Sequence, residues 1–107
     1  MIGFLTSQGW TVEAHRFRVG RHELDLVARR GRLVAFVEVK TRRGGRFGEG
    51  REAIGWRKRA ALSGVAEAWR QRHGRQDDLY RFDVVEVRAR ASGAPPEVIH
   101  LEDAWRP

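Results

Sequence analysis

Apolar and polar residues alternate with a period of two in several segments of the chain, most regularly in two neighbouring ones. This period is typical of a strand that buries one of its faces. From the alternation and the turn residues between segments, we predict strands over residues 11–18, 22–29, 33–40, 80–88 and 97–101, the last followed by a closing turn over residues 102–105.

A helical period replaces this alternation in two places. Residues 2–8 predict a short helix that ends at Gly9. Residues 51–72 predict a long helix, because their apolar residues recur at helical spacing and form one stripe. The stripe consists of Ile54, Ala61, Leu62, Val65, Ala68 and Trp69.

The predicted order of elements is α-β-β-β-α-β-β, which indicates an α/β fold. The strand over residues 33–40, the long helix and the strand over residues 80–88 can form a right-handed crossover between parallel strands. The two earlier strands pair antiparallel, so we expect a mixed β-sheet flanked by helices. A chain of 107 residues has room for one core, and residues 1–107 therefore form a single domain.

The two most regular strands are joined by Gly31 and Arg32, and glycine at the first position is typical of a two-residue type II′ hairpin turn. In that register Asp25 lies opposite Glu38 and Glu23 lies opposite Lys40. Val27 and Phe36 share this acidic face. The other face is apolar and carries Leu24, Leu26, Ala28, Leu33, Ala35, Val37 and Val39.

Two carboxylates placed opposite each other on a sheet repel, so a bound cation, basic side chains or a shared proton must offset the repulsion. Carboxylate oxygens, the Val39 carbonyl and water suit Mg²⁺ or Mn²⁺. Lys40 points to the same face and could polarise a water or stabilise developing charge on a phosphate. The alternative is an ordinary exposed face whose charges are solvated or paired with arginine.

Composition and charge narrow the class of protein. With 41% hydrophobic and 33% charged residues the chain is globular, and the absence of cysteine excludes disulfides and thiolate sites. We find no signal peptide and no apolar run long enough for a membrane span, so the cytoplasm is the expected compartment. A net charge of +7 favours nucleic acid as partner, although arginine-rich codon usage would also produce it.

Several basic and aromatic residues are open to two interpretations. Lys58, the second of two lysines, sits in the middle of the apolar stripe, where it either extends to solvent or reaches the carboxylates or a phosphate. Trp56 either packs, stacks on bases or mediates dimerisation. The candidates for phosphate contact, which could equally be solvated charges, are Arg42, Arg43 and Arg46, in a glycine-rich loop predicted over residues 41–50, together with Arg57.

The acidic face carries a family resemblance. Glu23-Leu24-Asp25-Leu26-Val27-Ala28, followed by Val37-Glu38-Val39-Lys40-Thr41-Arg42, resembles the core motif of the PD-(D/E)xK nuclease superfamily. More closely, the chain resembles the YraN family of predicted endonucleases, which is distantly similar to archaeal Holliday junction resolvases. The resemblance runs from about Phe4 to Trp105. It departs from the family at His22, where glycine is usual, and before Glu13, where family members carry an acid in a longer helix.

The resemblance implies a restriction-endonuclease-like fold that hydrolyses DNA with Mg²⁺ or Mn²⁺, including branched or otherwise structured DNA. Asp25 and Glu38 correspond to the metal-binding acids and Lys40 to the catalytic lysine, while Glu23 belongs to the pattern without a defined role. Junction cleavage would need two centres and hence a homodimer. Two rival hypotheses are a non-catalytic nucleic-acid-binding module and a domain whose carboxylates pair with a partner protein's arginines.

Overall fold

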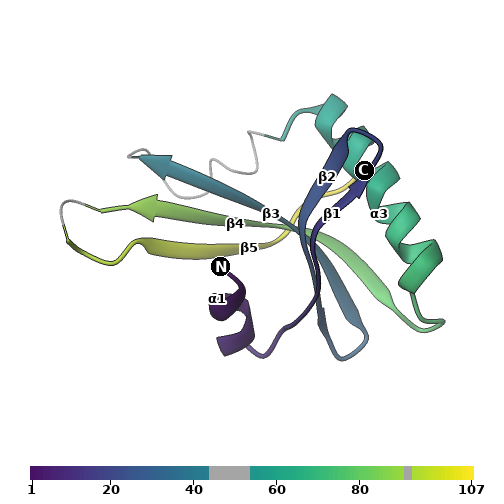
Figure 1. Cartoon of the computed structure of the whole chain (residues 1–107), viewed down its shortest axis with the longest axis horizontal. Coiled ribbons are helices and arrows are strands. Elements are labelled where there is room, and N and C mark those ends of the chain that lie inside the picture. The colour runs from purple at the N-terminus through teal and green to yellow at the C-terminus, as the bar shows by residue number, and fades with distance from the viewer. Residues whose placement is uncertain (44–53, 91–92) are drawn as a thin grey trace.

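A computed structural model gives the fold of the chain and describes residues 1–43, 54–90 and 93–107 (Figure 1). Its elements follow the predicted order of one helix, three strands, a second helix and two strands. They are α1 (Ile2–Ser7), β1 (Thr11–Val19), β2 (His22–Arg30), β3 (Leu33–Arg43), α3 (Trp56–His73), β4 (Leu79–Ala89) and β5 (Glu97–Trp105).

The five strands form one sheet in the order β1-β2-β3-β4-β5. Strands β3 and β4 run parallel, and the other neighbouring pairs are antiparallel. The parallel pair is the one separated in sequence by α3, as a crossover connection requires. The predicted α/β class with a mixed sheet is therefore confirmed.

Each face of the sheet carries an apolar cluster. The cluster on the α3 side contains Val27, Phe36, Phe82 and the buried residues of α3. The cluster on the α1 side contains Leu5 of α1 together with Leu26, Ala35 and Val37. Within the described ranges, neither helix combines the length and the apolar character needed to cross a membrane.

The hairpin turn between β2 and β3 agrees with the prediction. Gly31 has φ 63°, whereas Arg32 is not among the residues with positive φ, which distinguishes type II′ from type I′. The ladder pairs Arg30 with Leu33 and Val27 with Phe36, as this turn requires. The turn therefore sets the register that carries the acidic residues.

Strand β3 is longer than predicted. Thr41, Arg42 and Arg43 continue it and pair with residues of β4, the last pair being Arg43 and Ala89. The prediction that Arg42 and Arg43 lie in a loop is therefore wrong. Pairing with β4 extends the strand, and no local sequence pattern indicates that pairing. Arg46 lies outside the described residues.

Helix α3 begins later than predicted. Gly55 has an extended backbone (φ −70°, ψ 165°) and precedes the first helical residue, Trp56. Ile54 therefore lies outside the helix, although it is only 1% exposed and packs in the cluster on the α3 side. Leu62, Val65 and Trp69 of the predicted stripe are buried. Ala61 and Ala68 are only partly buried, and Ala66, which was not predicted in the stripe, is buried.

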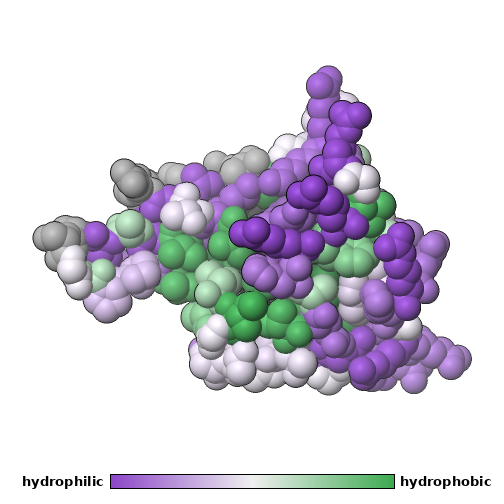
Figure 2. Space-filling view, in the orientation of Figure 1, coloured by the Kyte–Doolittle hydropathy of each residue, from purple (hydrophilic) through white to green (hydrophobic). Residues whose placement is uncertain are grey.

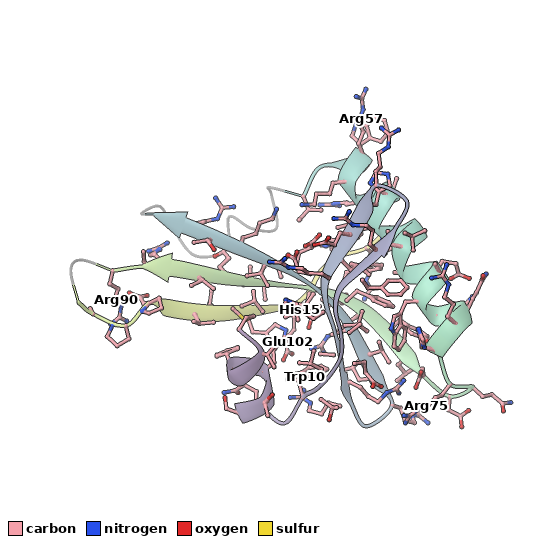
Figure 3. All side chains as sticks on the ribbon, in the orientation of Figure 1. Trp10, His15, Arg57, Arg75, Arg90 and Glu102 are labelled. Atoms are coloured by element: carbon pink, nitrogen blue, oxygen red, sulfur yellow. The ribbon has the colours of Figure 1, made fainter. Side chains whose placement is uncertain are left out.

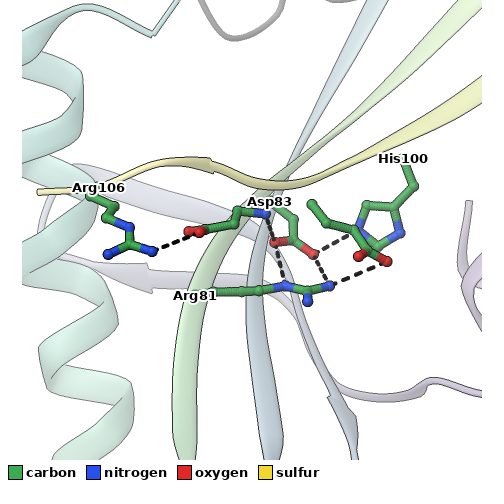
Figure 4. Close-up of polar contacts among 6 residues, drawn as sticks. Arg81, Asp83, His100 and Arg106 are labelled. Carbon is green, nitrogen blue, oxygen red and sulfur yellow. Dashed lines mark hydrogen bonds and ion pairs between the residues drawn. The ribbon is translucent and has the colours of Figure 1, made fainter.

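Strand β5 joins the predicted last strand and the predicted closing turn into one element. Its register against β4 shifts between Phe82 and Val84, and Asp103 at this irregularity has φ 49°. The buried Asp83 carboxylate holds the irregularity, because it accepts hydrogen bonds from the Asp103 N–H (2.9 Å), Arg81 (2.9 Å) and the His100 ring (2.6 Å) (Figure 4). These bonds hold the pKa of Asp83 below its ordinary value despite burial.

Candidate functional site

Asp25 and Glu38 come from neighbouring strands, at the point where the described β2–β3 ladder ends. The last main-chain pair is Leu26 with Val37. Beyond it the Asp25 side chain acts as an acceptor, because the Val39 N–H donates a hydrogen bond to Asp25 Oδ2 at 2.7 Å. The predicted pairs of Asp25 with Glu38 and of Glu23 with Lys40 are thus not part of this ladder.

The strand is irregular around Asp25, and this changes the expected faces. Leu24 packs in the cluster on the α3 side together with Val27, although strict alternation would place it with Leu26. Its position on the same face as Leu26 was therefore wrongly predicted. The adjacent residue of β1, Arg16, has φ 56°, so both strands depart from regular geometry beside the carboxylates.

The Asp25 and Glu38 carboxyl groups are nevertheless neighbours. Glu38 is 3% exposed, and burial raises its pKa to about 8. The Asp25 carboxyl contributes to the rise, both as a hydrogen-bond partner of protonated Glu38 and as a like charge. With its pKa at about 8, Glu38 is mostly protonated at neutral pH when no cation is present.

Two lysines converge on this pair. Lys58, in the first turn of α3, places Nζ 3.8 Å from Glu38 Oε1. Lys58 therefore reaches the carboxylates while part of its side chain stays in solvent. Lys40 follows Glu38 on β3, and its pKa is lowered by burial and by the neighbouring Lys58. The site thus combines two acids and two amines from β2, β3 and α3.

Asp25 can be reached from outside the molecule. It lines a depression of about 470 Å³ together with Val39, His15, Arg16 and the first residues of α1. Figure 3 shows His15 on the part of the sheet beside this region. Glu38, which is more deeply buried, is not among the residues that line this depression.

The other predicted site residues take separate positions. Glu23 pairs with Arg18 across the β1–β2 hairpin at 2.9 Å, and the structure shows no such pairing of Glu23 with Lys40 among the described contacts. Arg42 Nε lies 3.4 Å from Glu86 Oε1, so part of this arginine faces the sheet. Arg57 is exposed at the start of α3 and points away from the body of the molecule (Figure 3).

Glu86 is an acid that sequence reasoning missed. It is 1% exposed and is paired with Lys40 in the parallel β3–β4 register. Paired positions share a face of the sheet, so Glu86 lies on the face that carries Lys40. The alternation within β4 could not reveal this, because the neighbour and the register of β4 are decided by the crossover.

The donor set fits a small divalent cation. Among the residues that the structure describes, no group of three or more His, Asp, Glu or Cys side chains is suited to hold a metal. The candidate ligands are the Asp25 and Glu38 carboxylates, with the Val39 carbonyl predicted from the sequence as a third. Mg²⁺ is commonly bound by one or two carboxylates, with water and substrate phosphate as the remaining ligands. A cation bound between these acids would displace the proton of Glu38.

Comparison with known proteins shows similarity along most of the chain. The model of the family described as "Uncharacterised protein family UPF0102" matches residues 1–99. A UPF0102 protein of Caldicellulosiruptor saccharolyticus is 43% identical over 86 residues, which are 80% of this chain and 73% of the relative. One of Erythrobacter litoralis is 38% identical over 104 residues, which are 97% of this chain and 84% of the relative. One of Frankia casuarinae is 38% identical over 101 residues, with 94% and 85% covered.

Proposed function

We propose that this chain, which belongs to the uncharacterised protein family UPF0102, is a metal-dependent endonuclease that hydrolyses phosphodiester bonds of DNA. The observation that carries the proposal is the buried Glu38 carboxyl beside Asp25, with Lys58 Nζ 3.8 Å away. Two adjacent acids in a partly buried place destabilise a fold unless a ligand or a proton offsets their repulsion. A divalent cation bound by the two acids would offset their repulsion, and with a phosphate bound beside it the site could hydrolyse a phosphodiester bond.

Each residue of the cluster has a role in this proposal. Asp25, Glu38 and the Val39 carbonyl would hold Mg²⁺ or Mn²⁺, which when bound activates water and neutralises charge on the scissile phosphate. Lys40, with its lowered pKa, can exchange a proton with water or stabilise the developing negative charge. Lys58 balances the charge of Glu38 once that carboxyl has lost its proton.

Sequence features support the same function. The motif from Glu23 to Ala28 and from Val37 to Arg42 resembles that of PD-(D/E)xK nucleases and of the YraN family. The net charge of +7 suits a polyanionic substrate. Junction cleavage would need two such centres, so a dimer in sedimentation experiments would favour branched DNA as the substrate.

The rival in which a partner protein's arginines pair with the acids is less well supported, because Glu38 is only 3% exposed and an arginine from outside would meet Asp25 first. The other rival is a non-catalytic nucleic-acid-binding module, which a cleavage experiment distinguishes from a nuclease.

The test is incubation of the purified protein with labelled single-stranded, duplex, nicked, flapped and four-way DNA, in Mg²⁺, in Mn²⁺ and in EDTA. We expect metal-dependent cleavage of at least one structure. Glu38→Gln and Lys40→Ala should each lower the cleavage rate by about 100-fold or more, since the first removes a metal ligand and the second removes a group that stabilises charge on the reacting phosphate. DNA affinity should stay within a few-fold.

The matched control is Glu67→Gln, which removes the same charge from the exposed side of α3, where Glu67 contacts Arg70 and Gln71. This variant should cleave like the wild type. If the wild type binds DNA and cleaves none of these structures in either metal, the protein is a binding module. If it neither binds nor cleaves at low salt, both nucleic-acid hypotheses are rejected and the partner-protein hypothesis is the one to test next.

A further inference from the structure

We infer that the surface beside this centre, formed by Trp56 and a groove between the β1–β2 turn and α3, binds an unpaired DNA strand. The inference rests on the proposed nuclease function and names the part of the substrate that this surface takes. It begins with Trp56, which is 74% exposed at the first position of α3.

Trp56 differs from the other tryptophans of the chain. Trp10, Trp69 and Trp105 are 3%, 2% and 4% exposed and pack in the two apolar clusters. The Trp56 ring has the Arg57 guanidinium 5.2 Å from its centroid. Of the interpretations open for Trp56, packing is therefore excluded, and an exposed ring beside a cation is the combination that binds nucleic-acid bases.

A basic groove lies beside this ring. It has a volume of about 350 Å³ and lies between the turn after β1 and the first turns of α3, and it is lined in part by Arg21, Arg57, Lys58 and Glu23. Glu23 already pairs with Arg18, so the electrostatic potential of the groove is set by Arg21, Arg57 and Lys58 and is positive. Figure 1 shows the β1–β2 turn beside the start of α3, and Figure 2 shows hydrophilic side chains gathered over this end of the molecule.

The groove leads to the proposed reaction centre through one residue. Lys58 lines the groove and also places its Nζ 3.8 Å from Glu38 Oε1. A strand whose phosphates lie along Arg21 and Arg57 therefore passes within reach of the carboxylate pair. This continuity is the reason why we assign the surface to the substrate and not to a separate ligand.

The exposed Trp56 ring favours a DNA strand whose bases are unpaired. Inside a duplex each base is covered on both faces by its neighbours, so a side chain cannot stack on it, whereas bases of a single strand stack readily on aromatic rings. Phosphates of a duplex could contact Arg57, but no base of the duplex would then stack on the Trp56 ring. We therefore expect single-stranded or splayed DNA to bind here more tightly than blunt duplex.

The experiment is titration of the full chain in EDTA, where cleavage does not interfere, with three probes of matched sequence: a single strand, a blunt duplex and a duplex with splayed arms. Because Trp56 is the exposed tryptophan, stacking should quench the intrinsic fluorescence with the single strand and the splayed duplex. Trp56→Ala should weaken binding of both by about 5- to 150-fold, the usual range for one stacked base. Trp56→Phe should retain part of the affinity.

Arg57→Ala should lower the salt dependence of single-strand binding by about 0.7 in the slope of log K against log salt, as expected for one lost phosphate contact. Arg75→Ala is its matched control, because it removes the same charge beyond the other end of α3 (Figure 3) and should leave the slope unchanged. Circular dichroism of each variant confirms folding.

Three results would overturn the inference: quenching by blunt duplex equal to that by the single strand, unchanged single-strand affinity in Trp56→Ala, or a dimer that Trp56→Ala converts to monomer. The last would identify Trp56 as a self-association surface. Cleavage in Mn²⁺ without quenching of Trp56 rejects this inference and retains the nuclease. Quenching without cleavage of any structure retains the binding site and rejects the nuclease.

Discussion

Two acids of this protein show how the surroundings of a carboxyl group set its charge. The Asp78 side chain is 3% exposed and accepts two hydrogen bonds from Arg29, which lower its pKa to about 2. Glu38 lies deeper in the protein, and its burial together with the neighbouring Asp25 carboxyl raises its pKa to about 8. At neutral pH Asp78 is therefore ionised, whereas Glu38 is mostly protonated.

This contrast predicts a pH dependence of stability in EDTA. The pKa of Glu38 is about 8 in the folded chain against an ordinary value of 4.5, so the folded state binds more protons between these values. The contribution of Glu38 to the free energy of unfolding is fully present below pH 4.5 and falls as the pH rises to about 8. Urea unfolding at several pH values should show this fall in the wild type relative to Glu38→Gln, which cannot titrate. Parallel pH curves for the two proteins would contradict the raised pKa of Glu38.

Elements of the sheet are tied together by a buried arginine on β2. Arg29 is 7% exposed; its Nε donates to Glu13 of β1 at 2.6 Å, and its Nη atoms donate to Asp78, just before β4, at 2.5 and 2.9 Å. It therefore connects strands that lie on both sides of β3. This clamp lies at the end of β2 near the turn to β3, where Arg29 is paired with Val34.

Arg29→Met should lower the free energy of unfolding by about 3 kcal/mol, because it leaves the Asp78 carboxylate buried without its cation. Arg70→Met is the matched control: Arg70 pairs with Glu67 on the exposed side of α3, and such surface pairs contribute much less to stability than a buried pair. Urea unfolding at pH 7 measures both. An equal loss in the two variants would show that the clamp contributes no more than a surface pair.

At the scale of the whole molecule, the candidate site depends on three elements meeting at one place. Asp25 lies on β2, Glu38 and Lys40 on β3, and Lys58 on α3. A cation bound by Asp25 and Glu38 would bind the folded chain and not the unfolded one, because the unfolded chain does not hold these residues together. Binding should therefore stabilise the whole fold by mass action.

Millimolar Mn²⁺ should raise the melting temperature of the wild type by several degrees, since each kcal/mol corresponds to about 4–8 °C for a domain of this size. Asp25→Asn should lose the effect, because it removes one anionic ligand while keeping the shape of the side chain. Asp77→Asn, which removes a charge from the exposed segment before β4, should keep it. A melting temperature of the wild type that Mn²⁺ leaves unchanged would reject the cation site.

The sequence by itself determined the features that depend on near neighbours in the chain. The order of the elements follows from the periods of apolar residues, and the β2–β3 register follows from glycine at position 31, where φ is 63°. These features are local, because a two-residue turn and a period of two constrain residues only a few positions apart. They indicated that Asp25 and Glu38 are neighbours, but not the irregular backbone beside Asp25.

Tertiary structure decided the features that depend on distant partners. The continuation of β3 to Arg43 needs β4, and the position of Glu86 beside Lys40 needs the parallel register. The same is true of Lys58, whose distance of 3.8 Å from Glu38 exists only because α3 packs on that face of the sheet. Pairing and packing of this kind join residues far apart in sequence, and the free energy that selects them comes from burial over the whole core, which no local pattern records.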